Sequence, residues 1–324
     1  MGDVEPRAAT CRVAATLTPD RSCAHAPDGA LFVDAGCSQG CSSSIVSGVA
    51  MSVVLVTGAS SGIGLATSIA FAKRGDRVFG SVRDDQGAGR LLAAASDHNV
   101  RTTAIQFDVT HDDEVRRGVA SVIAEAGRID VLVNNAGVGH FGPIETTTDE
   151  QWCAIFEVNV FGVARVCRAV LPAMREARSG VIVNVSSING KIAGSFGGPY
   201  CASKFALEAL SESLLFEVEP FGVRVVVVEP GQFDTPIFDK GRAVPLVDSV
   251  YTERETRFRS NLPEPGAARD PTVAAEVIVA AADGTRSGFR YPAGSDAEFL
   301  LAARAKATDD EWLELVRSFI RENP

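Results

Sequence analysis

The chain has 324 residues, of which 46% are hydrophobic and 22% are charged, as in a soluble globular protein. Its formal net charge of −10 argues against a nucleic-acid-binding protein, which needs a basic face for the phosphates. No apolar run approaches the roughly 18 residues that span a bilayer, so we expect no membrane-spanning segment.

Residues 1–50 show neither helical nor strand periodicity, and they lack the basic start and apolar core of a signal peptide. They hold four of the seven cysteines: Cys11, Cys23, Cys37 and Cys41. A metal site with His25 is conceivable, but the cysteines lack paired C-x-x-C spacing, and we predict no metal site. The scattered thiols fit a reduced, cytoplasmic protein. We interpret residues 1–50 as a disordered extension or a mis-assigned start, followed by one functional domain at 51–324.

From residue 52 on, short β-branched strands alternate with helices. The predicted strands cover 53–56, 77–82, 102–107, 129–133, 181–185, 223–228 and, more briefly, 289–292. A first helix is predicted at 63–74, another begins after a Thr110 cap, and a long helix carrying Asn159 opens at a capping box of Thr148 and Gln151. This alternation predicts an α/β fold, a parallel sheet with helices on both faces. Ligands of such folds bind beyond the carboxyl ends of the strands.

A glycine-rich turn at 57–64 follows the first strand and opens the first helix. Gly58 permits the tight turn, Gly62 lets the backbone approach a pyrophosphate, and Gly64 lets the helix pack on the strand. The free N–H groups at the helix start suit the phosphates of a dinucleotide. The spacing is G-x-x-x-G-x-G and not the commoner G-x-G-x-x-G, so the segment taken alone could be only a turn.

Polar side chains follow two more of the predicted strands. The run Asn134-Asn135-Ala136-Gly137 comes after the fourth strand, where its small residues let a cofactor approach and its asparagines can tie adjacent strands. The alternative is an Asx turn. Asp108 follows the third strand, where its carboxylate could accept a hydrogen bond from an adenine amino group or serve local turn chemistry.

Tyr200 and Lys204 stand four residues apart, so they share one face of a helix, with Ser187 after the fifth strand. A free tyrosine has a pKa of about 10, and a nearby ammonium favours the phenolate and lowers that pKa. Tyr200 could then exchange a proton with a substrate oxygen that Ser187 holds by a hydrogen bond. A lone Tyr-x-x-x-Lys is usually a surface pair. Its combination with Ser187 and the dinucleotide turn points to a carbonyl/alcohol oxidoreductase.

Arg83 ends the second strand, where the adenosine ribose lies in doubly wound folds. An acidic residue there would bind the 2′-hydroxyl of NAD, whereas an arginine suits the 2′-phosphate of NADP. We therefore favour NADP(H) over NAD(H). Asp84 and Asp85 follow and either can cap the next helix; if one of them faced the ribose instead, the preference would weaken.

Together these residues resemble the classical short-chain dehydrogenase/reductase family over about residues 52–292, with Pro230-Gly231 after the sixth strand as a further match. The resemblance implies a Rossmann-type fold, a nicotinamide cofactor and a catalytic tetrad of Asn159, Ser187, Tyr200 and Lys204. In it Tyr200 is the acid/base, Lys204 lowers its pKa and binds the nicotinamide ribose, and Ser187 orients the substrate oxygen. Asn159 holds a water on the proton path.

The resemblance also implies the residues that contact the dinucleotide: Gly58, Ser60, Ser61, Gly62, Ile63, Gly64, Arg83, Asp108, Val109, Asn135, Ala136, Gly137, Tyr200, Lys204, Gly231, Phe233 and Thr235. Asp108 and Val109 would contact the adenine, and Phe233 and Thr235 the carboxamide end. The runs 200–208 and 220–223 look like the hydroxysteroid and retinol dehydrogenase branch of the family. A homodimer or homotetramer is expected by the same analogy.

The segment from about 231 to 270 is rich in large apolar side chains, among them Phe233, Ile237, Phe238, Val244, Leu246, Val247, Tyr251, Phe258 and Leu262. It could fold over the active site as a substrate lid or simply pack onto the body. A lid would imply an apolar alcohol or ketone, such as a steroid or retinoid. Two alternatives remain: the same fold acting on a polar or acyl-type carbonyl, and a dinucleotide-binding regulator without turnover.

Overall fold

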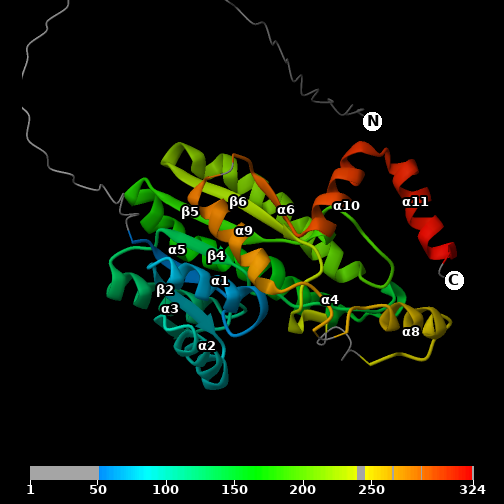
Figure 1. Ribbon diagram of the computed structural model, residues 1–324, viewed down its shortest axis with the longest axis horizontal. Helices are drawn as coiled ribbons and strands as arrows, with labels where there is room; N and C mark the ends of the chain where they lie inside the picture. The colour runs from blue at the N-terminus through cyan, green and yellow to red at the C-terminus, as the bar shows by residue number, and fades with distance from the viewer. Residues whose placement is uncertain (1–50, 239–244, 265, 286, 323–324) are drawn as a thin grey trace, which may run out of the picture. The chain divides into compact units, whose positions relative to one another are not determined.

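The computed structural model describes residues 51–238, 245–264, 266–285 and 287–322, so the predicted extension at 1–50 lies outside the described residues. The strands are β1 Val53–Val56, β2 Arg77–Val82, β3 Thr102–Gln106, β4 Val131–Asn134, β5 Gly180–Val185, β6 Val223–Pro230 and β7 Arg290–Ala293. They form a seven-stranded sheet of order β3-β2-β1-β4-β5-β6-β7 (Figure 1), and every pairing is parallel. All seven predicted strands are confirmed.

The helices of the described ranges are α1 Gly62–Lys73, α2 Asp85–Asp97, α3 Asp112–Ala126, α4 Asp149–Phe156, α5 Val163–Ala177, α6 Gly198–Val218, α8 Thr252–Ser260, α9 Pro271–Asp283, α10 Ser295–Lys306 and α11 Asp309–Glu322. Helices α1 and α9 lie side by side on one face of the sheet (Figure 1), together with α2, and α3, α5 and α6 cover the other face. The predicted doubly wound architecture is therefore confirmed.

Strand β1 shows why helices cover both faces of the sheet. Val54 and Val56 point into the core under α1 and α9, and Leu55 points into the core under α5 and α6. All three side chains have no exposed surface. Because successive side chains of a strand point to opposite faces, a strand with no polar position must be buried on both sides.

The order of the strands in the sheet indicates where a ligand binds. From β1 the chain moves outward to β2 and β3 and then returns to β4, which pairs with the other edge of β1. The carboxyl ends of β1 and β4 therefore flank the point where the strand order reverses, which is where doubly wound sheets bind ligands.

Two of the predicted helix starts can be compared with the structure. The capping box is confirmed, since the Thr148 hydroxyl accepts from the Gln151 N–H and the Gln151 side chain accepts from the Thr148 N–H. The Thr110 cap is wrong: α3 begins after His111, which makes no side-chain cap. Thr110 instead donates its hydroxyl to Asp108, because that carboxylate lies only two residues away at the end of the preceding strand.

No helix within the described ranges is long and apolar enough to cross a membrane. Cys153, Cys167 and Cys201 lie on α4, α5 and α6 and are free thiols, the last two buried.

Candidate active site

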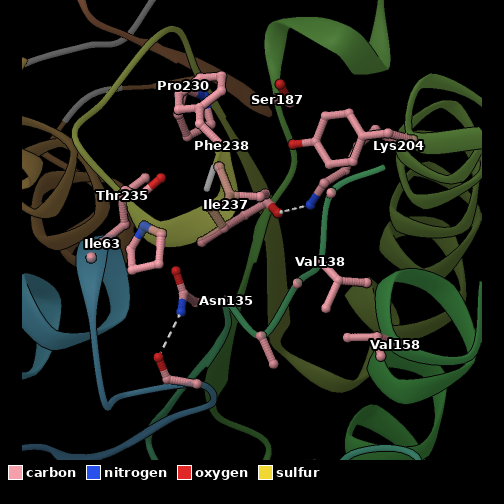
Figure 2. Close-up of a pocket in the computed structure, with 18 of the residues that line it drawn as sticks. Ile63, Asn135, Val138, Val158, Ser187, Lys204, Pro230, Thr235, Ile237 and Phe238 are labelled. Atoms are coloured by element: carbon pink, nitrogen blue, oxygen red, sulfur yellow. Dashed lines mark hydrogen bonds between the residues drawn. The ribbon is translucent and has the colours of Figure 1, made fainter. Parts of the chain in front are cut away.

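A cavity of about 410 Å³ lies at the carboxyl ends of the strands, within the range of small-molecule sites. Of the predicted cofactor and catalytic residues it is lined by Gly58, Ser60, Ser61, Gly62, Ile63, Arg83, Asp108, Val109, Asn135, Ala136, Gly137, Ser187, Tyr200, Lys204, Gly231, Phe233 and Thr235. Gly64 and Asn159 do not line it. Figure 2 shows Ser187 and Lys204 on one side of the cavity and Ile63 and Thr235 on the opposite side.

The glycine-rich turn is held tightly between two neighbouring loops. Gly58 has φ of +67°, and a Cβ added to it would lie 2.9 Å from the Cα of Ala136. Gly62 has φ of +54°, and its Cβ would lie 2.9 Å from the Thr235 methyl group. The left-handed φ angles, and the backbone and side-chain neighbours at this distance, explain why glycine occupies both positions.

The start of α1 is suited to an anion. Ser61 is its N-cap residue but makes no side-chain cap, and the first turn carries no acidic residue. The first N–H groups of a helix have no partner within the helix, and they bind phosphate readily. Ser61, Gly62 and Ile63 line the cavity, so the residues fit the pyrophosphate of a dinucleotide.

Asn135 ties the glycine-rich turn to β4. Its side-chain amide donates to the carbonyl oxygens of Thr57, at 2.9 Å, and Gly58, at 3.2 Å. In return the Thr57 hydroxyl accepts from the N–H groups of Asn135 and Ala136, both at 3.0 Å. Asn134 donates to the Asn184 side chain of β5 at 2.9 Å. The predicted role of the asparagines in joining adjacent strands is confirmed, and Thr57 is a partner that the sequence pattern did not single out.

Ser187 and Tyr200 meet in the cavity from different elements. Ser187 follows β5, and its hydroxyl accepts from the N–H of Asn189 at 3.1 Å. Tyr200 lies in the first turn of α6, partly exposed toward the cavity, and its phenol is hydrogen-bonded to Ser187. Burial raises the pKa of Tyr200 to about 12, against a smaller lowering by the Ser187 hydrogen bond.

Lys204 lies one helical turn further along α6 and is 4% exposed. Its ammonium donates to the main-chain carbonyl of Val185 at 2.9 Å. Burial lowers the pKa of Lys204 to about 8. The expectation that Lys204 lowers the Tyr200 pKa is wrong for this structure, because the ammonium bonds to a carbonyl and burial of the phenol is the largest effect.

Asn159 lies behind the cavity wall in a π-helical turn, Glu157–Gly162, between α4 and α5. Its side chain is fully buried, and its amide group accepts from the N–H of Val138 at 2.9 Å and donates to the Val138 carbonyl at 3.0 Å. It also donates to the Ser203 hydroxyl at 2.9 Å. Asn159 thus joins the loop after β4 to the helix that carries Tyr200 and Lys204, through a serine that the sequence pattern did not indicate.

At the far end of the cavity, Arg83 is exposed at the end of β2. Asp84 caps α2 by accepting from the Gly87 N–H at 2.6 Å, so its carboxylate is engaged in the helix start. Asp108 accepts from both the N–H and the hydroxyl of Thr110, which confirms the local turn role considered for it. Arg90 was not predicted; its guanidinium donates to the Ser60 carbonyl at 3.3 Å, next to the glycine-rich turn.

Aromatic rings form part of the cavity wall. Phe258 of α8 packs edge-on against Phe141, with ring centroids 5.5 Å apart, and lies at the same distance from Phe196. Phe238 is stacked on Phe141 at 6.4 Å. Phe141, Phe238 and Phe258 line the cavity, with Ile237 and Leu262, and Figure 2 shows Ile237 and Phe238 beside the site.

The predicted lid segment, 231–270, was considered either as a lid over the active site or as a segment that packs onto the body, and its side chains do both. Four of its apolar side chains line the cavity: Ile237, Phe238, Phe258 and Leu262. Phe233 also lines the cavity but is only 2% exposed and packs into the core under the Arg269 guanidinium. Leu246 and Val247 are nearly half exposed, and Val244 lies outside the described residues.

In the ranges that the structure describes, no three or more His, Cys, Asp or Glu side chains are grouped to hold a metal ion. The four cysteines before residue 50 lie outside those ranges.

Comparison with known protein families gives a match to the short chain dehydrogenase model over residues 52–244. A 3-ketodihydrosphingosine reductase of Bacteroides thetaiotaomicron is 42% identical over 190 residues, covering 58% of this chain and 66% of that protein. The 17-beta-hydroxysteroid dehydrogenase type 1 of Homo sapiens is 33% identical over 289 residues, covering 85% of this chain and 86% of that protein.

Solved structures show the same likeness. A short-chain dehydrogenase from Streptomyces avermitilis superposes with a TM-score of 0.70 at 40% identity, covering 84% of this chain and 96% of the other. A metagenomic short-chain oxidoreductase in complex with NADP gives 0.60 at 29% identity, with 75% and 97% covered. A short-chain dehydrogenase/reductase from Burkholderia phymatum in complex with NAD gives 0.68 at 25%, with 78% and 92% covered.

Proposed function

The chain belongs to the short-chain dehydrogenase family, and from that premise we propose that it is an NADP(H)-dependent oxidoreductase that interconverts an apolar alcohol and its ketone or aldehyde. The observation that carries the proposal is the content of one cavity. The hydrogen-bonded pair of Ser187 and Tyr200 lies in it, together with the uncapped start of α1. A nicotinamide dinucleotide, when bound, supplies hydride transfer to or from the substrate carbon.

In this proposal Tyr200 exchanges a proton with the substrate oxygen, and Ser187 donates a hydrogen bond to the same oxygen and holds it in place. Because the pKa of Tyr200 is raised to about 12, the phenol is protonated at neutral pH. A protonated phenol can donate its proton to the substrate oxygen. This protonation state therefore favours reduction of a carbonyl over oxidation of an alcohol.

Lys204 and Asn159 support this pair in different ways. Lys204 places a positive charge under the site and binds the nicotinamide ribose, and its bond to Val185 fixes its position at the end of β5. Asn159 holds the Val138 backbone and Ser203, and in this proposal it would hold a water that continues the proton path to solvent.

The glycine-rich turn would hold the pyrophosphate, Asp108 and Val109 the adenine, and Gly231, Phe233 and Thr235 the carboxamide end. Preference for NADP(H) rests on Arg83, which lines the cavity and makes no ion pair among the described residues. Asp84 is occupied as the cap of α2, and neither Asp84 nor Asp85 lines the cavity, which supports a 2′-phosphate rather than the 2′-hydroxyl of NAD beside Arg83. A guanidinium matches a phosphate in charge and hydrogen-bond geometry.

An apolar substrate is supported by the aromatic wall of Phe141, Phe238 and Phe258, which lines the same cavity as Ser187 and Tyr200. The names of two relatives point the same way, since 3-ketodihydrosphingosine is a long-chain ketone and a 17-beta-hydroxysteroid is a polycyclic alcohol. The substrate class that we propose is therefore a bulky ketone or alcohol of steroid, retinoid or long-chain type.

The test is turnover of NADPH and NADH by the full chain with a panel of ketones matched in size, some apolar and some polar or acyl-type. We expect NADPH oxidation with the apolar members. Turnover only with polar or acyl-type carbonyls would replace the apolar substrate class, and tight dinucleotide binding without turnover on any carbonyl would favour a regulator over an enzyme.

We also propose that the chain self-associates through the outer faces of α5 and α6. A groove between these helices is lined by Leu171, Leu210 and Leu214, with Arg168, Arg175 and Glu217 among its charged residues. Charged groups of both signs around an apolar strip suit a self-complementary contact. Light scattering of the purified chain distinguishes a dimer or tetramer from a monomer.

A further inference from the structure

Two glutamates are buried directly behind the catalytic side of the cavity. Glu208 of α6 and Glu229 of β6 are both only 3% exposed. A glutamate is almost never buried to this extent unless it is paired. Glu208 accepts from the Arg290 guanidinium at 2.9 Å through one carboxylate oxygen. Its other oxygen, and one oxygen of Glu229, have no hydrogen-bond partner among the described residues.

The periodicity of the two elements brings these side chains together. Tyr200, Lys204 and Glu208 recur every four residues on α6, so they share one helix face. Along β6, Val223 and Val225 pack into the core under α6, so Glu229, which has the same parity, points to that face. Helix α6 packs along β6 (Figure 1).

A third unpaired group belongs to the same cluster. Ser186 precedes Ser187, is 3% exposed, and its hydroxyl has no hydrogen-bond partner in the described ranges. Its N–H donates to the Val228 carbonyl at 2.8 Å, which places it beside Glu229 in the sheet. A Cβ added to Gly190 would lie 2.7 Å from the Ser186 hydroxyl and 3.1 Å from the unpaired oxygen of Glu208. The Ser186 hydroxyl and the unpaired oxygen of Glu208 therefore lie around one buried point under the loop that carries Ser187. Glu229 follows Val228 in β6, points to the face of the sheet that α6 covers, and feels the charge of Glu208.

The charged groups that face this point come from four elements. Lys204 and Glu212 lie on α6 with Glu208, Arg290 is on β7, and Lys191 follows the short helix after Ser187. Burial and the like charge of Glu208 raise the pKa of Glu229 to about 7, against a lowering by Arg290 and Lys191. For Lys204, burial lowers the pKa and the charge of Glu208 raises it.

We propose, on the basis of the function proposed above, that Glu208 and Glu229 share one proton and together keep Lys204 positively charged beneath the active site. Near neutral pH the pair carries one negative charge instead of two. The protonated carboxyl of Glu229 is then a second donor in the cluster, beside the Ser186 hydroxyl. The carboxylate of Glu208 accepts from the Arg290 guanidinium. Both glutamates are positioning residues, since neither lines the cavity.

The first experiment follows Lys204 directly. We would measure the pKa of its amine by NMR of the full chain labelled with ¹³C-lysine, with the resonance assigned from a Lys204→Met sample. Glu208→Gln removes the nearest negative charge, and we expect the pKa of Lys204 to fall by about one unit. Glu212→Gln is the matched control, because Glu212 also binds Arg290, at 2.7 Å, but is half exposed. An equal change in both variants, or none in Glu208→Gln, would overturn the proposal.

The second experiment tests the shared proton and needs neither substrate nor cofactor. Folded Glu229 holds its proton above its ordinary pKa, so the contribution of Glu229 to stability falls as pH rises from about 4.5 to about 7. Glu229→Gln cannot ionise, and its melting temperature should equal that of the wild type near pH 4.5 and exceed it increasingly up to pH 7.5. A difference in melting temperature that is independent of pH would overturn the shared proton. Glutamine is nearly isosteric with glutamate, so we expect Glu229→Gln to fold. Its melting curve can be interpreted whether or not Glu208→Gln folds.

If an active substrate is found, the same variants separate this proposal from the function itself. Glu208→Gln should move the alkaline limb of kcat/KM to lower pH by the same amount as the amine pKa, and Glu212→Gln should leave it in place. An enzyme with no activity on any carbonyl would refute the proposed function, while the NMR and melting results would still decide on the glutamate pair.

Discussion

The ammonium of Lys204 lies 5.8 Å from the centre of the Tyr200 ring and donates its hydrogen bond to the Val185 carbonyl, 2.9 Å away. The hydrogen bond of the lysine is therefore made to the main chain, while its ammonium lies near the ring of the tyrosine. The phenol hydroxyl instead meets Ser187. This arrangement leaves the hydroxyl free for the proton transfer that we propose, and it separates the expected effects of changing each residue.

The first prediction concerns Tyr200. Tyr200→Phe removes the hydroxyl but keeps the ring that packs over Lys204, so we expect kcat to fall by about 10²–10⁴-fold, the usual contribution of general acid–base catalysis. Dinucleotide affinity, measured by fluorescence titration, should change by less than about fivefold, since losing one hydrogen bond costs about 1 kcal/mol or less. Tyr251→Phe is the control, because Tyr251 does not line the cavity. Turnover like that of the wild type in Tyr200→Phe would exclude the mechanism.

The second prediction concerns the choice of dinucleotide. Arg83→Ala should weaken NADPH binding by about 10–100-fold, since charge-assisted hydrogen bonds are worth about 1.5–3 kcal/mol, and should change NADH binding little. Isothermal titration with both dinucleotides measures the ratio. Arg101→Ala serves as control, because Arg101 is exposed just before β3, outside the cavity lining. Equal losses for NADPH and NADH would remove Arg83 from the 2′-phosphate.

The third prediction concerns the aromatic wall. Phe258→Ala removes the ring that contacts both Phe141 and Phe196. We expect KM for a bulky apolar ketone to rise by about tenfold or more, since a buried aromatic side chain contributes about 1.5–3 kcal/mol, and KM for a small polar ketone to change little. Phe216→Ala is the control, because Phe216 is 66% exposed on α6. A similar rise in KM for both ketones would show that the wall does not select the substrate.

Most of the fold could be predicted from the sequence because its signals are local. Strands such as β1, a continuous run of apolar residues between turns, have one stable environment, a sheet covered on both faces. Predicted strand limits agree with the structure to within two residues. The Thr110 cap failed because another local partner, the Asp108 carboxylate, competes for the same hydroxyl.

The residues of the site could be predicted from the sequence only where they lie close together in one motif. Tyr200 and Lys204 are four residues apart and could be paired on a helix face, and the glycine turn follows a strand directly. Thr57, Ser203 and the aromatic Phe196 could not be found in this way. The partners cited for them lie between 44 and 79 residues away in the sequence, and no periodic pattern indicates contacts at such separations. Glu229 was missed because a single glutamate at a strand end carries no sign of its burial.

The last prediction concerns the cost of burying Lys204. Burial lowers the pKa of this lysine from 10.5 to about 8, so below pH 8 the ammonium is charged in both states and destabilises the folded one. As pH rises from about 8 to 10.5, the folded protein loses this proton while the unfolded chain keeps it, so the free energy of unfolding rises with pH. The shift corresponds to about 3 kcal/mol at most, at 1.36 kcal/mol per pKa unit.

Lys204→Met lacks this titration, so it should be more stable than the wild type at pH 7.5, and the difference should shrink toward pH 10.5. Urea unfolding at pH 7.5, 9 and 10.5 measures it. The raised pKa of Tyr200 lowers stability above about pH 10, but it acts on both proteins and cancels in their difference. Lys73→Met, at an exposed position of α1, should show no such trend. A stability difference that stays constant across this pH range would mean that Lys204 keeps an ordinary pKa, and that its charge is already compensated in the folded protein.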